Sequence, residues 1–180
     1  MEDLNSPQSE HQRLLAQVLI RVGRNLLLYQ QIELGLKASI PYVHPEGSAA
    51  GRESFERLLT RLKEKSLGEQ MARLKQTLTG DKEDMVALDA YLGRVLETRN
   101  DLAHNFLTLP GISINDPEGC KSAIRFLDES HAVAEPLLHM VLALAAGGLR
   151  ISGDLDPQEL ERLINGCGGS VLSDDAPGLQ

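Results

Sequence analysis

The stretch EHQRLLAQVLIRVGRNLLLYQQIELGLKASI, residues 10–40, decides the fold class. Its apolar residues recur at steps of three and four, which is the spacing that one face of an α-helix requires. Pro41 predicts the end of this helix, and Glu33 stands where the stripe calls for an apolar residue. The members of the stripe are Leu15, Val18, Leu19, Val22, Leu26, Tyr29, Leu36 and Ile40.

Helical spacing continues along the rest of the chain, and no alternating strand pattern of any length interrupts it. The further helices are expected at residues 52–64, 66–79, 81–106, 117–146 and 156–164, with a kink before Pro136 and an end at Gly147-Gly148. We therefore predict an all-α, up-and-down bundle of four to five main helices. It occupies residues 10–165, between a flexible N-terminus (residues 1–9) and a flexible tail (residues 166–180).

Composition favours a soluble protein of the cytoplasm. Hydrophobic residues make up 42% of the chain and charged residues 24%, as in globular domains. Two cysteines 47 residues apart fit a reducing compartment, and the apolar run 137–149 is too short to span a membrane. The acidic start does not resemble a signal peptide. No phosphate-binding loop, dinucleotide fingerprint or nucleophile elbow occurs, so no cofactor is expected.

The formal net charge of −8 disfavours general binding to nucleic acids, which depends on neutralising phosphates. One region differs, because residues 57–75 contain six basic and two acidic side chains. A local basic patch there is one interpretation, and a solvated helix face is the other. The candidate substrate-binding residues of such a patch are Arg57, Arg61, Lys63 and Lys65.

The segment RNDLAH, residues 99–104, carries the chemistry. Arg99 interrupts the apolar stripe of the helix expected at 81–106, as Glu33 interrupts that of the first helix. Because a buried charge needs a partner, these two residues are expected to meet or to line a shared cleft. The alternative is that the stripe drifts by one residue and leaves them at the rim. Asn100 and His104 are four residues apart and should share one helix face.

An arginine followed by a polar residue, with a histidine five positions after the arginine, resembles the signature of the HEPN superfamily. That resemblance implies a helical bundle that acts as a homodimeric, metal-independent ribonuclease of toxin–antitoxin, antiphage or RNA-processing systems. The facing motifs of two subunits would form a composite site with RNA as substrate and an antitoxin or regulatory protein as a further partner. Arg99 would hold the scissile phosphate, and His104 would act as general base or acid on the 2′-hydroxyl, leaving a 2′,3′-cyclic phosphate. Asn100 would orient substrate or histidine, with Glu33 and Asp101 in support.

Two alternatives remain open. The first is a non-catalytic HEPN-like binding or scaffolding module. It is suggested by the acidic net charge and by Phe106, which stands where one toxin subgroup has a tyrosine that is adenylylated. The second alternative is a metal-binding bundle, in which carboxylate and imidazole groups lie one turn apart on two helices and Glu33 supplies a further carboxylate. Its ligands would be Asp101, His104, Asp128 and His131.

Overall fold

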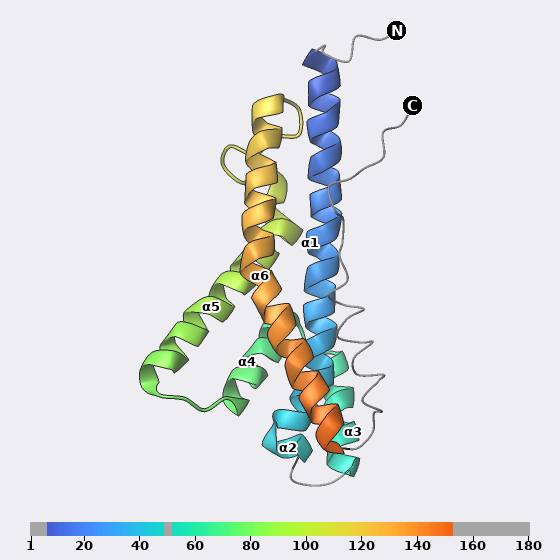
Figure 1. Ribbon diagram of the computed structural model, residues 1–180, viewed down its shortest axis with the longest axis vertical. Helices are drawn as coiled ribbons and strands as arrows, with labels where there is room; N and C mark the ends of the chain where they lie inside the picture. Colours follow the sequence, from blue (N-terminus) through green and yellow to red (C-terminus); the bar gives the residue numbers. More distant parts are fainter. Residues whose placement is uncertain (1–6, 49–51, 153–180) are drawn as a thin grey trace.

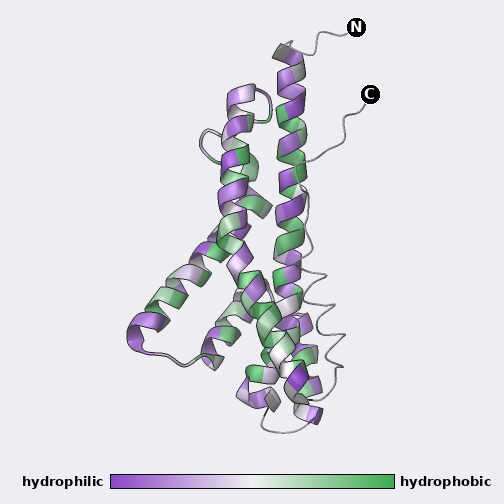
Figure 2. Ribbon diagram, in the orientation of Figure 1, coloured by the Kyte–Doolittle hydropathy of each residue, from purple (hydrophilic) through white to green (hydrophobic). Residues whose placement is uncertain are grey.

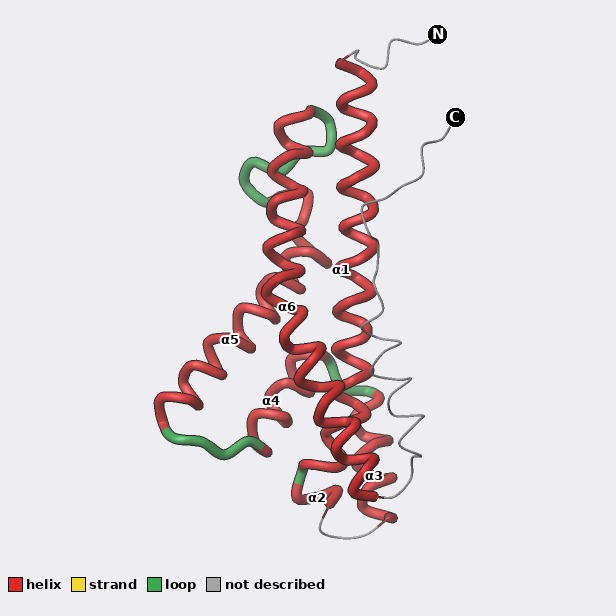
Figure 3. Tube along the Cα trace, in the orientation of Figure 1, coloured by secondary structure: helices red, strands yellow, loops and turns green. Residues whose placement is uncertain are grey.

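The computed structural model describes residues 7–48 and 52–152, and within these two ranges every regular element is helical (Figure 3). The all-α prediction is confirmed for this part of the chain. The elements are α1 (Pro7–Val43), α2 (Pro45–Ser48), α3 (Arg52–Lys63), α4 (Leu67–Thr77), α5 (Lys82–Asn100), a π turn (Asp101–Asn105), a 3₁₀ turn (Phe106–Thr108) and α6 (Pro117–Ser152).

Helices α1 and α6 form the spine of the molecule and lie side by side along most of their lengths (Figure 1). They run in the same direction, since His11 at the start of α1 bonds Ile114 just before α6, whereas Gly35 packs on Val141 further along. Helix α5 runs the opposite way and diverges from the spine, and α2 and α3 gather near the carboxyl end of α1. Apolar residues alternate with hydrophilic ones along both spine helices (Figure 2).

The core face of α1 is displaced from the stripe that the sequence predicted. Leu19 is 61% exposed and Leu26 is 42% exposed, whereas Ile32 is fully buried. Adjacent apolar pairs in this helix offer two registers, and burial follows the register that faces α6. The buried residues of this face are Leu14, Val18, Leu28, Tyr29, Ile32, Leu36 and Ile40. Position 32 is therefore the core position, and Glu33 beside it lies at the rim.

The ends expected for the first helix and for the helix at 117–146 are wrong. Helix α1 passes Pro41 and ends at Val43, because the amide of His44 donates to the carbonyl of Ile40 at 2.8 Å and keeps the last turn closed. Helix α6 passes through Gly147-Gly148 to Ser152. Gly148 is needed for packing, since a Cβ there would overlap the ring of Tyr42 on α1. The close approach of the two helices, and not a helix end, explains that glycine.

The capping predictions hold at two helix starts. Asp81 accepts from the amide of Asp84 at 2.9 Å, and Asp116 accepts from the amide of Gly119 at 2.7 Å. Helix α1 begins at Pro7, within the segment expected to be frayed. The expected helix at 156–164 and the tail at 166–180 lie outside the described residues.

Helix α6 contains Pro136 and changes direction near its middle (Figure 1). A proline removes one helical hydrogen bond and kinks the helix, so the kink expected at this residue has its cause in the sequence. By length and composition alone the Pro117–Arg150 part of α6 is apolar enough to cross a membrane, a test that core helices of soluble proteins also pass. One face of this helix is buried against α1, from Cys120 to Ala146.

Candidate functional site

Arg99, Asn100 and His104 form one cluster, here named the Arg–His cluster, because the chain leaves α-helical winding at this point. Helix α5 ends at Asn100, and the next five residues make a π turn, so the regular helix expected up to Phe106 is wrong. In an α-helix, residues five apart point about 140° away from each other. The wider π turn, with its i to i+5 bonds, brings them onto nearly the same side. Arg99 Nη1 consequently lies 3.4 Å from His104 Nε2.

The contacts of Arg99 hold the cluster together. Its Nη1 donates to Asn100 Oδ1 at 3.0 Å as well as contacting His104 Nε2. Since a guanidinium only donates hydrogen bonds, His104 Nε2 is the acceptor in this contact. Arg99 and Asn100 are half-buried and His104 is exposed. The cluster therefore presents a guanidinium and an imidazole to solvent together.

Neighbouring residues hold the π turn in place. Leu102 is buried in the core, and the ring of Phe106 packs on Phe126 of α6 with centroids 6.0 Å apart. Asn105 Nδ2 donates to Asp101 Oδ1 at 3.1 Å, which ties the end of the turn to its beginning. Asp101 thus contacts the turn itself, as a supporting residue would.

A cleft of about 210 Å³ lies beside Arg99. Glu33 and Arg99 both line it, whereas Glu33 pairs with Lys37 at 2.7 Å and no ion pair joins it to Arg99. Both side chains lie at the rim of the bundle and not in its core, as the alternative reading held. The lining residues are Leu26, Tyr29, Gln30 and Glu33 of α1, Leu67 of α4, Arg99 of α5 and Ala103 of the π turn.

Tyr29 joins α1 to α5 at the residue before Arg99. Its hydroxyl lies 2.8 Å from Thr98 Oγ1, and only 5% of the residue is exposed. Burial raises the pKa of Tyr29, and the hydrogen bond to Thr98 and the charge of Arg99 only partly oppose this, so the phenol stays protonated. Tyr29 belongs to the apolar stripe predicted for the first helix, and nothing in the sequence pattern distinguishes it from an ordinary core residue.

The basic residues proposed for substrate binding are mostly engaged with carboxylates. Arg61 pairs with Glu46 at 3.0 Å, Lys65 pairs with Glu69 at 2.7 Å, and Arg57 lies 3.9 Å from Glu53. The Lys65 ammonium and the backbone and side chain of Ser66 lower the pKa of Glu69 to about 2. Lys63 is exposed. These contacts favour the solvated helix face over an unneutralised basic patch.

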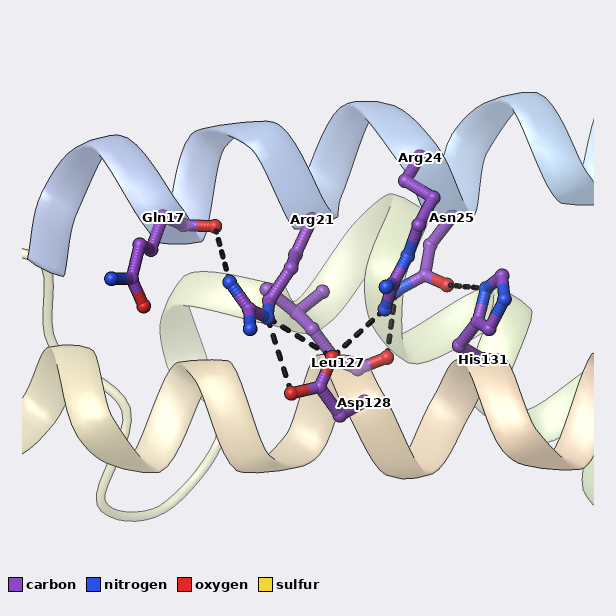
Figure 4. A network of polar contacts seen from close by, with 7 residues as sticks. All are labelled: Gln17, Arg21, Arg24, Asn25, Leu127, Asp128 and His131. Carbon is purple, nitrogen blue, oxygen red and sulfur yellow. Dashed lines mark hydrogen bonds and ion pairs between the residues drawn. The ribbon is translucent and has the colours of Figure 1, made fainter. Parts of the chain in front are cut away.

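The residues of the metal-binding alternative do not come together. Within residues 7–48 and 52–152, no three histidine, cysteine, aspartate or glutamate side chains are grouped so that they could hold a metal ion. Asp128 Oδ1 instead accepts from Arg21 at 3.0 Å and from Arg24 at 2.8 Å. His131 Nδ1 lies 3.1 Å from Asn25 Oδ1 (Figure 4). Asp128 and His131 thus connect α1 to α6, and the four residues are not gathered at one site.

We call this second group the seam network; its residues are Arg21, Arg24, Asn25, Asp128 and His131. Asn25 is fully buried, and its Nδ2 donates to the carbonyl of Leu127 at 2.8 Å. Burial would raise the pKa of Asp128, but hydrogen bonds and charge from Arg24 and Arg21 outweigh it and lower that pKa. Burial, followed by the charge of Arg24, lowers the pKa of His131. The network is a set of matched partners between two helices.

Comparisons of the chain with protein-family models, with the sequences of curated proteins and with solved structures gave no significant match.

Proposed function

We propose that this chain is a HEPN-like, metal-independent endoribonuclease of the cytoplasm that acts through Arg99 and His104. The observation that supports this most directly is the contact between Arg99 Nη1 and His104 Nε2, at 3.4 Å, on an exposed π turn beside a cleft. π turns occur frequently at functional sites. A guanidinium next to an imidazole combines a phosphate-binding group with a group that can accept or donate a proton.

In the proposed reaction, Arg99 binds the non-bridging oxygens of the scissile phosphate and stabilises the charge that develops on them. His104 removes the proton from the neighbouring 2′-hydroxyl, whose oxygen attacks phosphorus. The bond from phosphorus to the 5′-oxygen breaks, and a second acid, assigned to His104 of a second copy, protonates that oxygen. The products are a 2′,3′-cyclic phosphate and a 5′-hydroxyl. Asn100 Oδ1 positions Arg99.

The test is cleavage of a mixed-sequence single-stranded RNA by the wild type and by His104→Ala. We expect the variant to be slower by about 10²-fold to 10⁴-fold, the usual contribution of a general acid or base. His139→Ala is the matched control, because His139 is also exposed but lies on α6. Equal rates for wild type and His104→Ala, or an inactive wild type, would contradict the catalytic proposal.

The outer face of α1 supports the proposed homodimer. Ile20, Leu27 and Leu34 are 58%, 61% and 65% exposed, and they recur at intervals of seven residues. Leu19 and Leu26 widen this stripe, and Leu26 also lines the cleft. The pattern is symmetric about Leu27, with Ile20 seven residues before and Leu34 seven after. An antiparallel second copy would pair the stripe with itself, as an isologous interface requires.

Leu27→Glu tests this interface. A charge at the centre of the stripe would face its own copy across the two-fold axis, so we expect the variant to sediment as a monomer at concentrations where the wild type is a dimer. Val86→Glu is the control, since Val86 is 62% exposed on α5, away from the stripe. A monomeric wild type would refute the homodimer.

A non-catalytic binding module is the second candidate. It is favoured by the net charge of −8 and by the pairing of Arg57, Arg61 and Lys65 with carboxylates, which leaves little unneutralised positive charge for RNA. In that case RNA would be neither cleaved nor bound, and substitution of His104 would affect only association with a protein partner.

A further inference from the structure

The cleft beside the Arg–His cluster presents opposite charges that do not neutralise each other. Glu33 Oε1 pairs with Lys37, and Arg99 Nη1 is held by Asn100 and His104. Among the described residues, no hydrogen bond or ion pair uses Glu33 Oε2 or the Nε and Nη2 groups of Arg99. The cleft therefore offers an acceptor oxygen from α1 and donor groups from α5 to a single bound molecule.

The remaining lining of the cleft suits a flat ring. Leu26 and Ala103 contribute exposed apolar surface and Gln30 an amide, whereas Tyr29 and Leu67 are 5% and 3% exposed and contribute little of the accessible lining. A guanidinium plane, here that of Arg99, is a surface on which proteins stack unpaired RNA bases. The volume of about 210 Å³ is below the range of about 300–1,000 Å³ typical of sites for whole small molecules. One ring system fits this description better than a complete nucleotide.

The carboxylate determines which base is favoured. An ionised carboxylate only accepts hydrogen bonds, so it matches a base edge that presents adjacent donors. The Watson–Crick edge of guanine presents N1–H and the N2 amino group side by side, whereas adenine and cytosine present one amino donor next to an acceptor nitrogen. Uracil presents a single N–H between two carbonyl acceptors, which would face the carboxylate unfavourably.

We propose that this cleft binds a guanine base of single-stranded RNA, with Glu33 reading its donor edge and Arg99 contacting the adjoining phosphate. The proposal rests on the proposed function in taking RNA as the ligand. Lys37 occupies one acceptor site of Glu33 Oε1. The second site of Oε1 and both sites of Oε2 can therefore accept the N1–H and N2 amino donors of the base. The cleft would thus direct cleavage to positions next to guanine.

Binding can be measured without cleavage in the His104→Ala background, by fluorescence anisotropy with the short RNAs UUGUU, UUAUU and UUIUU, where I is inosine. We expect UUGUU to bind at least about tenfold more tightly than UUAUU, the usual size of one bidentate contact. Inosine lacks the N2 amino group, so UUIUU should fall between them. Glu33→Gln should abolish this ranking, since an amide offers only one acceptor oxygen.

Glu97→Gln is the matched control, because Glu97 is an exposed carboxylate on α5 that does not line the cleft, and it should keep the ranking. Equal affinities for UUGUU and UUAUU, or a ranking that Glu33→Gln leaves intact, would overturn the guanine site. A guanine preference in a wild type that cleaves no RNA would refute the nuclease but not this site. Cleavage of RNA without any base preference would refute the guanine site but not the nuclease.

Discussion

The Arg–His cluster and the seam network share three residue types, arginine, asparagine and histidine, to which the seam network adds Asp128, yet they are built differently. The seam network joins residues more than 100 positions apart on α1 and α6, and each carboxylate, amide and imidazole in it has a partner there. The Arg–His cluster is contained within six residues, on a π turn, and its histidine is exposed. Matched partners between two helices serve stability, whereas side chains held only by their neighbours in sequence remain available to a ligand.

The two arginines give the largest expected contrast. Arg99→Ala should lower kcat/KM for RNA cleavage by about 10²-fold to 10³-fold, because it removes a charged donor from the transition state. Its free energy of unfolding should change by less than about 0.5 kcal/mol. Arg24→Ala should leave cleavage unchanged and lower the free energy of unfolding by about 1 kcal/mol, since Asp128 keeps Arg21. Cleavage rates and urea denaturation of the two variants measure these effects. A loss of cleavage in Arg24→Ala would contradict the assignment of the seam network to stability alone.

The two asparagines separate the regions by stability. Asn25→Ala should lower the free energy of unfolding by about 2 kcal/mol, because a fully buried amide with two hydrogen bonds is removed and His131 loses its acceptor. Asn100→Ala should cost less than about 0.5 kcal/mol, since Asn100 is half-buried and bonds only Arg99 in the cluster. Urea denaturation of the two variants measures these changes. Equal losses in the free energy of unfolding would contradict the distinction between the seam network and the Arg–His cluster.

The seam histidine gives the smallest effect, which appears in the pH dependence of stability. The pKa of His131 is lower in the folded protein than its ordinary value of 6.5, so the unfolded chain binds the proton more tightly. The contribution of His131 is therefore fully present above about pH 6.5 and is lost as the pH falls below that value. His131→Gln should flatten the fall in the free energy of unfolding between about pH 7 and pH 5. His139→Ala, an exposed histidine, should leave that slope unchanged; the opposite pattern would refute the assignment.

Most of the helical content could be read from the sequence, because periodicity and capping residues are local signals. Asp81 and Asp116 marked their helix starts correctly. The face of α1 could not be read, since paired apolar residues such as Val18-Leu19 fit either register and only contact with α6 decides between them. Gly148 was misleading for a similar reason, because its role depends on Tyr42, more than 100 residues away.

The candidate site was predictable as a set of residues but not as a geometry. The sequence pointed to Arg99, Asn100 and His104, and it anticipated a cleft shared with Glu33. It did not show the π turn, since helical winding of five residues leaves no periodic signal in so short a segment. Asp128 and His131 were weighed as metal ligands because their spacing is right. Their partners on α1, which no local sequence pattern reveals, make them links between α1 and α6.

The π turn can also be regarded as the result of inserting one residue into an α-helix. A π turn contains one residue more than an α turn, so this segment is equivalent to an α-helix that has gained a single amino acid. One added residue rotates everything that follows by about 100° relative to what precedes it. A single inserted codon would therefore suffice to bring a histidine from the far side of a helix onto an arginine, without altering the packing of the helix before it.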